Sequence, residues 1–239
     1  IDKRNFNLFQ PLLYQVATGL VSRSDVATPL RELVGTQDNV QVLLGEVTAV
    51  NPEGKQIVFN GKAYSYDHLI LATGSGSTYF GHEDWRTFAP PMKILEHAEE
   101  IRRRLLMAME QAEQTPNPEA RQFLQTVVIV GGGPTGCEMA GAVSELMRWA
   151  LNSAFKQLDS QKTRIVLVDP GDRVLRAMPE ELSKEAQKAL ELNGVEFIPQ
   201  GRVQTMRPGE VVISSPDGDV RIQAATVIWT AGVKPSHLG

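Results

Sequence analysis

The sequence has 239 residues, a hydrophobic content of 42% and a formal net charge of −4 at pH 7, enough apolar material for one large or two modest globular domains. Its basic residues are interspersed with acidic ones and form no single-sign stripe, which excludes nucleic acid as an expected partner. No apolar stretch approaches the ~18 residues of a membrane-spanning helix, and the N-terminus lacks the apolar run of a signal peptide, so we expect neither insertion nor export.

The N-terminal part predicts one helix followed by a β meander. Residues 1–5 have the character of the end of an element, so we expect an upstream segment that this sequence lacks. Residues 25–34 carry apolar side chains at helical spacing, with Asp25 placed to cap the helix and Gly35 to end it. Apolar residues at 40–44, 47–50 and 57–59, with turn residues at 51–54, predict antiparallel strands.

A buried strand and a long helix are expected next. The apolar run 69–72 ends at Gly74, the pattern of a buried strand that enters a glycine turn. Residues 97–114 form a charged amphipathic pattern typical of a helix, and the two prolines within 115–118 end it.

The following stretch predicts alternating strands and helices. Strands are expected at 127–130, 164–168 and 195–198, with helices at 135–158 and 180–193 between them. This β-α-β-α-β order is that of the mononucleotide-binding half of a Rossmann fold. Further strands are expected around 211–214 and 220–222, and residues 226–232 repeat the strand-into-glycine pattern of 69–74.

The loop after the first of these strands has the spacing of a dinucleotide-binding motif. Its glycines at the first, third and sixth positions serve a tight turn, a close approach of backbone to pyrophosphate, and close packing of helix on strand. The N–H groups at the start of the next helix can then hold phosphates. The loop consists of Gly131, Gly132, Gly133, Pro134, Thr135 and Gly136.

The acid that closes the second strand indicates which nicotinamide dinucleotide is bound. Asp169 is placed to bind the ribose hydroxyls and to repel the 2′-phosphate of NADP, so we expect NADH as the donor. Arg173 is the residue that would accept a 2′-phosphate if the loop turned toward it, which leaves NADPH as the alternative.

Two neighbouring helix residues have competing interpretations. Glu138 follows Thr135 by three residues, which is the spacing of a capping box, and it is equally a carboxylate one turn into the helix near the nicotinamide. Cys137 is interpreted as a small packing residue. As the only cysteine, it excludes an intramolecular disulfide, a dithiol centre and a cysteine metal site, and it fits a reducing, cytoplasmic compartment.

Asp2 indicates a second dinucleotide site, because an acid at the end of a strand is also the ribose-binding pattern. The alternative is a solvated terminal charge. Since the glycine turns at Gly74 and Gly232 suggest two interlocking nucleotide-binding domains, we expect the first glycine motif to lie upstream of Ile1.

Five segments together resemble the type II NADH:quinone oxidoreductases, the non-pumping NADH dehydrogenases of the FAD-dependent pyridine nucleotide-disulfide oxidoreductase superfamily. The resemblance covers essentially the whole chain, and its first segment is the most specific. The segments are 2–19 (DKRNFNLFQPLLYQVATG), 71–75 (LATGS), 79–81 (YFG), 130–138 (VGGGPTGCE) and 228–233 (IWTAGV).

The resemblance implies a role for each matching residue. Asp2, with Lys3 and Arg4, would bind the FAD ribose, and Val47 would present its backbone to the adenine. The loop 131–136 and Asp169 would hold NADH, and Glu138 would lie beside the stacked nicotinamide and flavin as the catalytic residue. The glycine turns that let the main chain approach the flavin would be Ala72, Thr73, Gly74, Ala231 and Gly232.

The implied fold is α/β, with two interlocking Rossmann-like domains for FAD and NAD(P), three-layer ββα/βαβ character, and N- and C-terminal parts missing. Residues 1–115 and 226–239 would belong to the FAD-binding domain and residues 116–225 to the inserted NAD-binding domain. The late flavin-contacting segment, the quinone motif and the membrane anchor would also lie outside the sequence.

The implied enzyme passes a hydride from NADH to FAD and electrons on to a quinone of the respiratory chain. It would be a peripheral protein at the inner, cytoplasmic face of the membrane, with a homodimer as one option for its assembly. The sequence leaves open a related flavoprotein with another acceptor, of the ferredoxin reductase or sulfide:quinone oxidoreductase type. A non-catalytic NAD(H)-binding redox sensor is the alternative from another class. The scattered histidines fit no metal site.

Overall fold

The computed structural model describes residues 1–159 and 162–238, with the backbone alone at residues 149–153. The chain forms two compact units. The first comprises residues 1–10, 22–76 and 233–239, and the second comprises residues 11–21 and 77–232.

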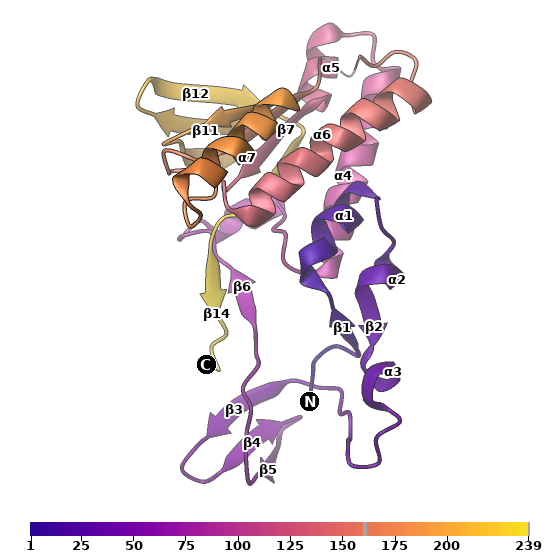
Figure 1. Cartoon of the computed structure of the whole chain (residues 1–239), viewed down its shortest axis with the longest axis vertical. Coiled ribbons are helices and arrows are strands. Elements are labelled where there is room, and N and C mark those ends of the chain that lie inside the picture. Colours follow the sequence, from indigo (N-terminus) through magenta and orange to yellow (C-terminus); the bar gives the residue numbers. More distant parts are fainter. Residues whose placement is uncertain (160–161, 239) are drawn as a thin grey trace. The chain divides into compact units, whose positions relative to one another are not determined.

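The second unit contains a parallel sheet in the order β13-β7-β8-β9, of which Figure 1 labels β7. Its core strands are apolar on both faces, as expected for strands covered from both sides. Val130 is in register with Val168 in β8, and Trp229 of β13 with Val130. The strands are β7 (Thr126–Val130), β8 (Arg164–Val168), β9 (Val195–Ile198) and β13 (Thr226–Trp229).

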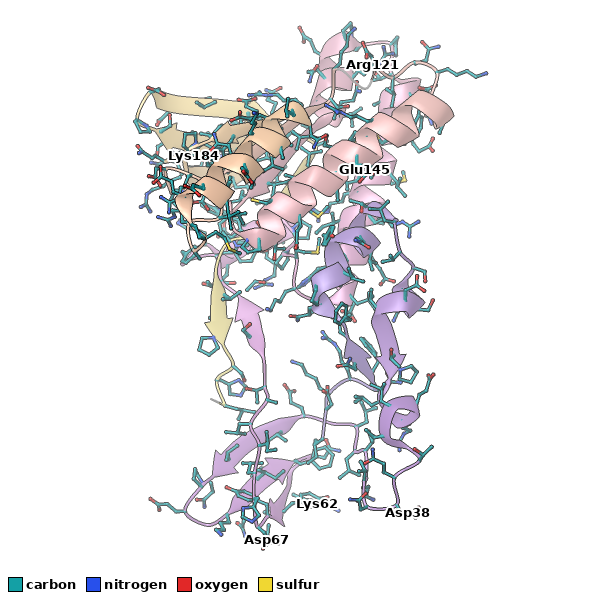
Figure 2. All side chains as sticks on the ribbon, viewed as in Figure 1. Asp38, Lys62, Asp67, Arg121, Glu145 and Lys184 are labelled. Carbon is teal, nitrogen blue, oxygen red and sulfur yellow. The ribbon has the colours of Figure 1, made fainter. Side chains whose placement is uncertain are left out.

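Helices cover one face of this sheet. Helix α6 (Pro134–Ala154) connects β7 to β8, and α7 (Glu180–Leu192) connects β8 to β9; Figure 1 shows the two side by side. Their charged residues Glu145 and Lys184 are exposed on the outer surface (Figure 2). Helix α4 (Leu95–Gln114) buries a stripe that recurs every three or four residues and packs on α1 (Leu13–Thr18), α5 (Pro118–Leu124) and β13.

An antiparallel meander packs against the sheet through a shared apolar core. Val128, Val130, Val166 and Val168 belong to one buried cluster with Met206, Val211, Ile213 and Ile222 of the meander. The strands of the meander are β10 (Arg202–Arg207), β11 (Glu210–Ser215) and β12 (Gly218–Gln223). The 3-10 helix η2 (Glu83–Thr87) contributes Trp85 to the same core.

The first unit consists of short strands and helices. The hairpin β1 (Phe6–Leu8) with β2 (Ala27–Pro29) is antiparallel, as is the meander of β3, β4 and β5. A further pair joins β6 to β14. The helices and strands of the whole chain whose bounds have not yet been given are η1 (Gln10–Leu12), α2 (Arg23–Val26), α3 (Leu30–Val34), β3 (Val47–Asn51), β4 (Gln56–Phe59), β5 (Lys62–Ser65), β6 (Ser75–Ser77) and β14 (Val233–Pro235).

The predicted single helix over 25–34 is wrong. Residues 23–26 form α2, residues 27–29 pair with β1, and α3 begins at Leu30, because Pro29 has no N–H to continue a helix. Asp25 is the third residue of α2 and forms a capping box, in which the Ser22 N–H donates to Asp25 Oδ2 at 2.7 Å. Gly35 ends α3 as predicted.

Two predicted strands are absent from the described residues. Leu44 makes only an isolated bridge with Asp2, so residues 40–44 form no strand. Residues 69–72 form no strand either, and Ile70 is 89% exposed. A buried strand needs neighbours on its edges, and no described strand pairs with this run.

Candidate functional site

The glycine loop lies at the carboxyl end of β7, the point where the strand order of the parallel sheet reverses. β8 lies on one side of β7, and β13, which comes last in the chain, lies on the other. In open α/β sheets, ligands bind in the crevice at such a switch point. The predicted motif is therefore positioned where a dinucleotide site is expected.

Two of its glycines are required by the packing of the loop itself. Gly131 has φ +115°, and a Cβ there would lie 2.8 Å from the Ala231 nitrogen. A Cβ on Gly136 would lie 1.7 Å from the Gly131 carbonyl oxygen. Glycine at these positions lets the start of α6 pack directly against the turn, which is the third role that the sequence motif predicts.

Gly133 faces open space at the start of α6. It is the N-cap residue of that helix, no side chain caps the helix N-terminus, and a Cβ on Gly133 would meet nothing within 4 Å. The first-turn N–H groups of a 21-residue helix therefore have no side-chain acceptor, and the helix dipole favours an anion there. This end of α6 fits the pyrophosphate of a dinucleotide.

Asp169 is fixed against the glycine loop by two backbone donors. The Gly132 N–H donates to Asp169 Oδ2 and the Gly171 N–H to Oδ1, each at 2.7 Å. The side chain is only 15% exposed. The loop after β8 also returns to the motif, because the Leu175 N–H donates to the Gly132 carbonyl at 2.8 Å. These hydrogen bonds thus hold the Asp169 carboxylate in a fixed position against the glycine loop.

The arginine beside this acid is Arg176, which the sequence interpretation missed. Arg176 Nε lies 4.0 Å from Asp169 Oδ1, and its side chain is 58% exposed. Arg173, the predicted alternative, donates to the Arg176 carbonyl at 3.4 Å, and its Nε is buried without a hydrogen-bond partner. The signal available in sequence was only that both arginines follow Asp169 within one short loop.

The capping interpretation of Glu138 is wrong. The helix begins one residue after Gly133, with Pro134 in its first position, so Thr135 is not the N-cap residue and no side chain caps the helix N-terminus. Glu138, taken as a whole residue, is exposed to solvent. Partial burial of its carboxyl group nevertheless raises the pKa of that group. A carboxylate at the end of the first turn is thus left for another role.

Cys137 is a packing residue, as the sequence indicates. Its Sγ contacts the Gly132 carbonyl oxygen at 3.6 Å. Burial, assisted by the nearby charges of Asp169 and Glu138, raises the pKa of the thiol to about 11. A thiol with so high a pKa is protonated at neutral pH and is a poor nucleophile.

The end of β13 supports the glycine loop from the other side. Thr230 Oγ1 donates to the carbonyl oxygens of Val130 at 2.8 Å and Gly131 at 3.0 Å, a contact that the sequence interpretation missed. Gly232 has φ +69°, and a Cβ there would lie 2.6 Å from Phe80 Cζ. Ala231 and Gly232 therefore lie at the same edge of the sheet as the loop 131–136.

The remaining predicted site residues belong to the first unit. The Asp2 backbone bonds Leu43 and Gly45, and Asp2 Oδ1 accepts the Arg4 N–H at 2.8 Å. Lys3 is exposed, and Val47 begins β3 with a register irregularity before Ala49. The segment Ala72–Gly74 is exposed, and Gly74 adopts φ +67° with open space around its Cβ position.

Neither a metal centre nor a membrane span is found among the described residues. Across 1–159 and 162–238, no three His, Cys, Asp or Glu side chains gather closely enough to hold a metal ion. No helix in the same ranges has the length and apolar character to cross a bilayer.

Comparison with known proteins adds a family and several relatives. The family described as pyridine nucleotide-disulphide oxidoreductase matches residues 1–239. The type II NADH:quinone oxidoreductase Ndh of Mycobacterium tuberculosis is 43% identical over 100% of this chain and 53% of its own length. A second protein of that organism, the type II NADH:quinone oxidoreductase NdhA, is 39% identical over 100% of this chain and 52% of its own length. The chain thus spans about half the length of the curated relatives it matches.

Solved structures share the fold. NDH2 from Plasmodium falciparum, solved in complex with NADH, superposes with a TM-score of 0.90 over 99% of this chain and 50% of its own, at 22% identity. The sulfide:quinone oxidoreductase of Aquifex aeolicus gives a TM-score of 0.79 over 99% of this chain and 52% of its own, at 16% identity. At these identities the likeness is one of fold.

Proposed function

Because this chain belongs to the pyridine nucleotide-disulphide oxidoreductase family, we propose that it carries the dinucleotide sites of a flavin-dependent NADH:quinone oxidoreductase. The whole protein would take a hydride from NADH onto FAD and pass the electrons to a quinone. Support comes from the type II NADH:quinone oxidoreductases of M. tuberculosis, which match the entire chain at 43% and 39% identity.

The observation that carries this proposal is the preorganised loop at the switch point of the sheet. The open N-terminus of α6 at Gly133 would hold the pyrophosphate, and Asp169 would accept the ribose hydroxyls. The carboxylate of Asp169 would repel the 2′-phosphate of NADPH, which favours NADH.

FAD is the hydride acceptor that this reaction requires, and residues of the chain fit it. Asp2 Oδ1 is engaged by the Arg4 N–H, which leaves Oδ2 available to the hydroxyls of a ribose. The left-handed turn at Gly74 leaves its backbone open to a close approach. Bound FAD would supply the redox chemistry. The residues proposed to hold it are Asp2, Lys3, Arg4, Val47, Ala72, Thr73, Gly74, Ala231 and Gly232.

Glu138 is the side chain that we assign to the hydride transfer. It lies two residues beyond the glycine loop, in no capping bond, with a pKa raised by burial. In this assignment its carboxylate helps to orient the nicotinamide, and the chain contributes alignment and exclusion of water.

The domain assignment follows the same proposal. Residues 116–225 would form the NAD-binding domain, inserted into an FAD-binding domain of residues 1–115 and 226–239. Quinones dissolve in lipid, so we propose peripheral association of the whole protein with the cytoplasmic face of the membrane.

The proposal is tested by a paired titration of the protein with NADH and NADPH, followed by nicotinamide fluorescence. NADH should bind more tightly, and an Asp169→Ala variant should lose that preference. Binding of neither nucleotide would overturn the site. In the whole protein, flavin absorbance should be bleached by NADH and restored by a quinone; absence of flavin would instead indicate a dinucleotide sensor.

A further inference from the structure

Phe80 is the exposed member of an otherwise buried aromatic group. Tyr79 is fully buried and stacks on Trp229 at 4.8 Å between ring centroids, whereas Phe80 is 68% exposed. Phe80 also adopts φ +52°, in the left-handed region that bulky side chains rarely occupy. The ring contacts Trp229 and yet keeps most of its surface exposed, so burial offsets little of the cost of this backbone conformation.

Thr78 holds the backbone around Phe80 through three hydrogen bonds. The Thr78 N–H donates to the Gly232 carbonyl at 3.3 Å, and the Thr78 carbonyl accepts Trp229 Nε1 at 3.0 Å. Thr78 Oγ1 accepts the Phe80 N–H at 3.2 Å. Both backbone polar groups of Thr78, its N–H and its carbonyl, are therefore bonded to residues at the end of β13. Strain of this kind persists where the surroundings over-determine it, and it clusters at ligand sites.

The ring lies at the ligand-binding edge of the sheet. A Cβ on Gly232 would lie 2.6 Å from Phe80 Cζ, so glycine at 232 makes room for this ring. The preceding residue, Ala231, contacts the glycine loop, since a Cβ on Gly131 would lie 2.8 Å from its nitrogen. Phe80 is therefore connected to the dinucleotide loop through two consecutive residues.

We propose that the Phe80 ring packs against the nicotinamide ring of bound NADH. The inference rests on the proposed function, because it assumes that the loop 131–136 binds a nicotinamide dinucleotide. Offset or edge-to-face contact between two planar rings contributes specificity of orientation beyond buried area. The Phe80 ring makes a tilted contact with Trp229, at 6.4 Å between ring centroids, and most of its surface remains exposed to a ligand.

Binding of ADP-ribose reports the rest of the site without the nicotinamide contact, because ADP-ribose retains the adenosine and pyrophosphate and lacks the nicotinamide. In Phe80→Ala, NADH should bind about three- to tenfold more weakly, the range that a lost aromatic contact gives, while ADP-ribose affinity is unchanged. Phe80→Tyr should bind NADH as the parent does. Equal loss for both ligands, or no loss for either, would overturn the proposal.

Two further variants separate a role of Phe80 in binding from a role in the fold. Phe80→Gly removes the ring and relieves the left-handed strain, so it should lose NADH affinity while its melting temperature is unchanged or raised. A lowered melting temperature would assign Phe80 to the fold instead. Leu192→Ala truncates an apolar side chain that is 73% exposed at the far end of α7, and it should leave both affinities unchanged. If the parent binds neither ligand, the proposed function itself fails.

Discussion

Two segments of this chain share one sequence pattern and differ in structure. Residues 127–131 and 69–74 are both apolar runs that enter a left-handed glycine. The first is the fully buried strand β7, with β8 and β13 bonded to its two edges. The second is irregular, with Ile70 89% exposed and no strand beside it among the described residues.

The difference shows that a buried strand is a property of its neighbours. Every N–H and C=O of a strand needs a partner, and an apolar side chain gains free energy only where another surface covers it. β7 obtains both from β8, β13, α6 and the meander β10–β12. The run 69–72 obtains neither from the described residues, so the same local pattern gives exposed backbone.

The largest expected effect contrasts Gly136, in the loop that follows β7, with Gly74, the glycine that ends the exposed segment. Gly136→Ala would place a Cβ 1.7 Å from the Gly131 carbonyl oxygen, so α6 must move from the loop. We expect destabilisation of ~3 kcal/mol or more, as for severe overpacking, together with loss of NADH binding. Chemical denaturation and NADH titration measure both.

Gly74→Ala is the matched control. Its Cβ would meet open space at φ +67°, so only backbone strain of ~1–2 kcal/mol applies. A Gly136→Ala protein as stable as Gly74→Ala would contradict the described packing of α6 on the loop.

The second prediction concerns the acid that preorganises the loop. In Asp169→Asn, one amide oxygen replaces two acceptors, and the amide N–H₂ must face a backbone N–H of Gly132 or Gly171. We expect NADH affinity to fall about tenfold or more, from ~1–3 kcal/mol of lost hydrogen bonding. The ratio of NADPH to NADH affinity should rise, because Arg176 remains without the opposing charge. An unchanged ratio would remove Asp169 as the discriminating residue.

Prediction from sequence succeeded where elements depend on their nearest partners in the chain. β8 was predicted with the observed bounds, and α7 to within one residue, because the β-α-β-α-β pattern supplies its own neighbours. It failed at residues 25–34, where pairing of β2 with β1 overrides helical spacing. It also missed β5 and β10, whose polar residues give no clear two-residue alternation.

The site residues also divide into those that the sequence predicted and those that it missed. The glycine loop and Asp169 follow from a motif whose spacing encodes backbone geometry. Thr230 and Arg176 act through contacts between the loop and segments that fold back onto it. The cap of α6 was wrong because Pro134 moves the start of the helix ahead of Thr135.

The third prediction uses the pKa of Glu138, which burial raises. The folded protein therefore holds this proton more tightly than the unfolded chain does, and stability declines as pH rises from the unfolded pKa through the folded one. Glu138→Gln removes that decline, so the variant should gain melting temperature relative to the parent as pH increases. Hydride transfer should slow about tenfold, equal to ~1.4 kcal/mol in the barrier. An unchanged rate would limit Glu138 to a surface role.

The smallest expected effect tests the exposed segment directly. Ile70→Ser should change the free energy of unfolding by less than ~0.5 kcal/mol, because the side chain is 89% exposed and loses no burial. Ile129→Ala, at a fully buried position of β7, should cost ~2–5 kcal/mol in the same denaturation experiment. A loss above ~1 kcal/mol in Ile70→Ser would show that another surface covers residues 69–72 in solution. The run would then have a neighbour after all, and its apolar pattern would have the same physical cause as that of β7.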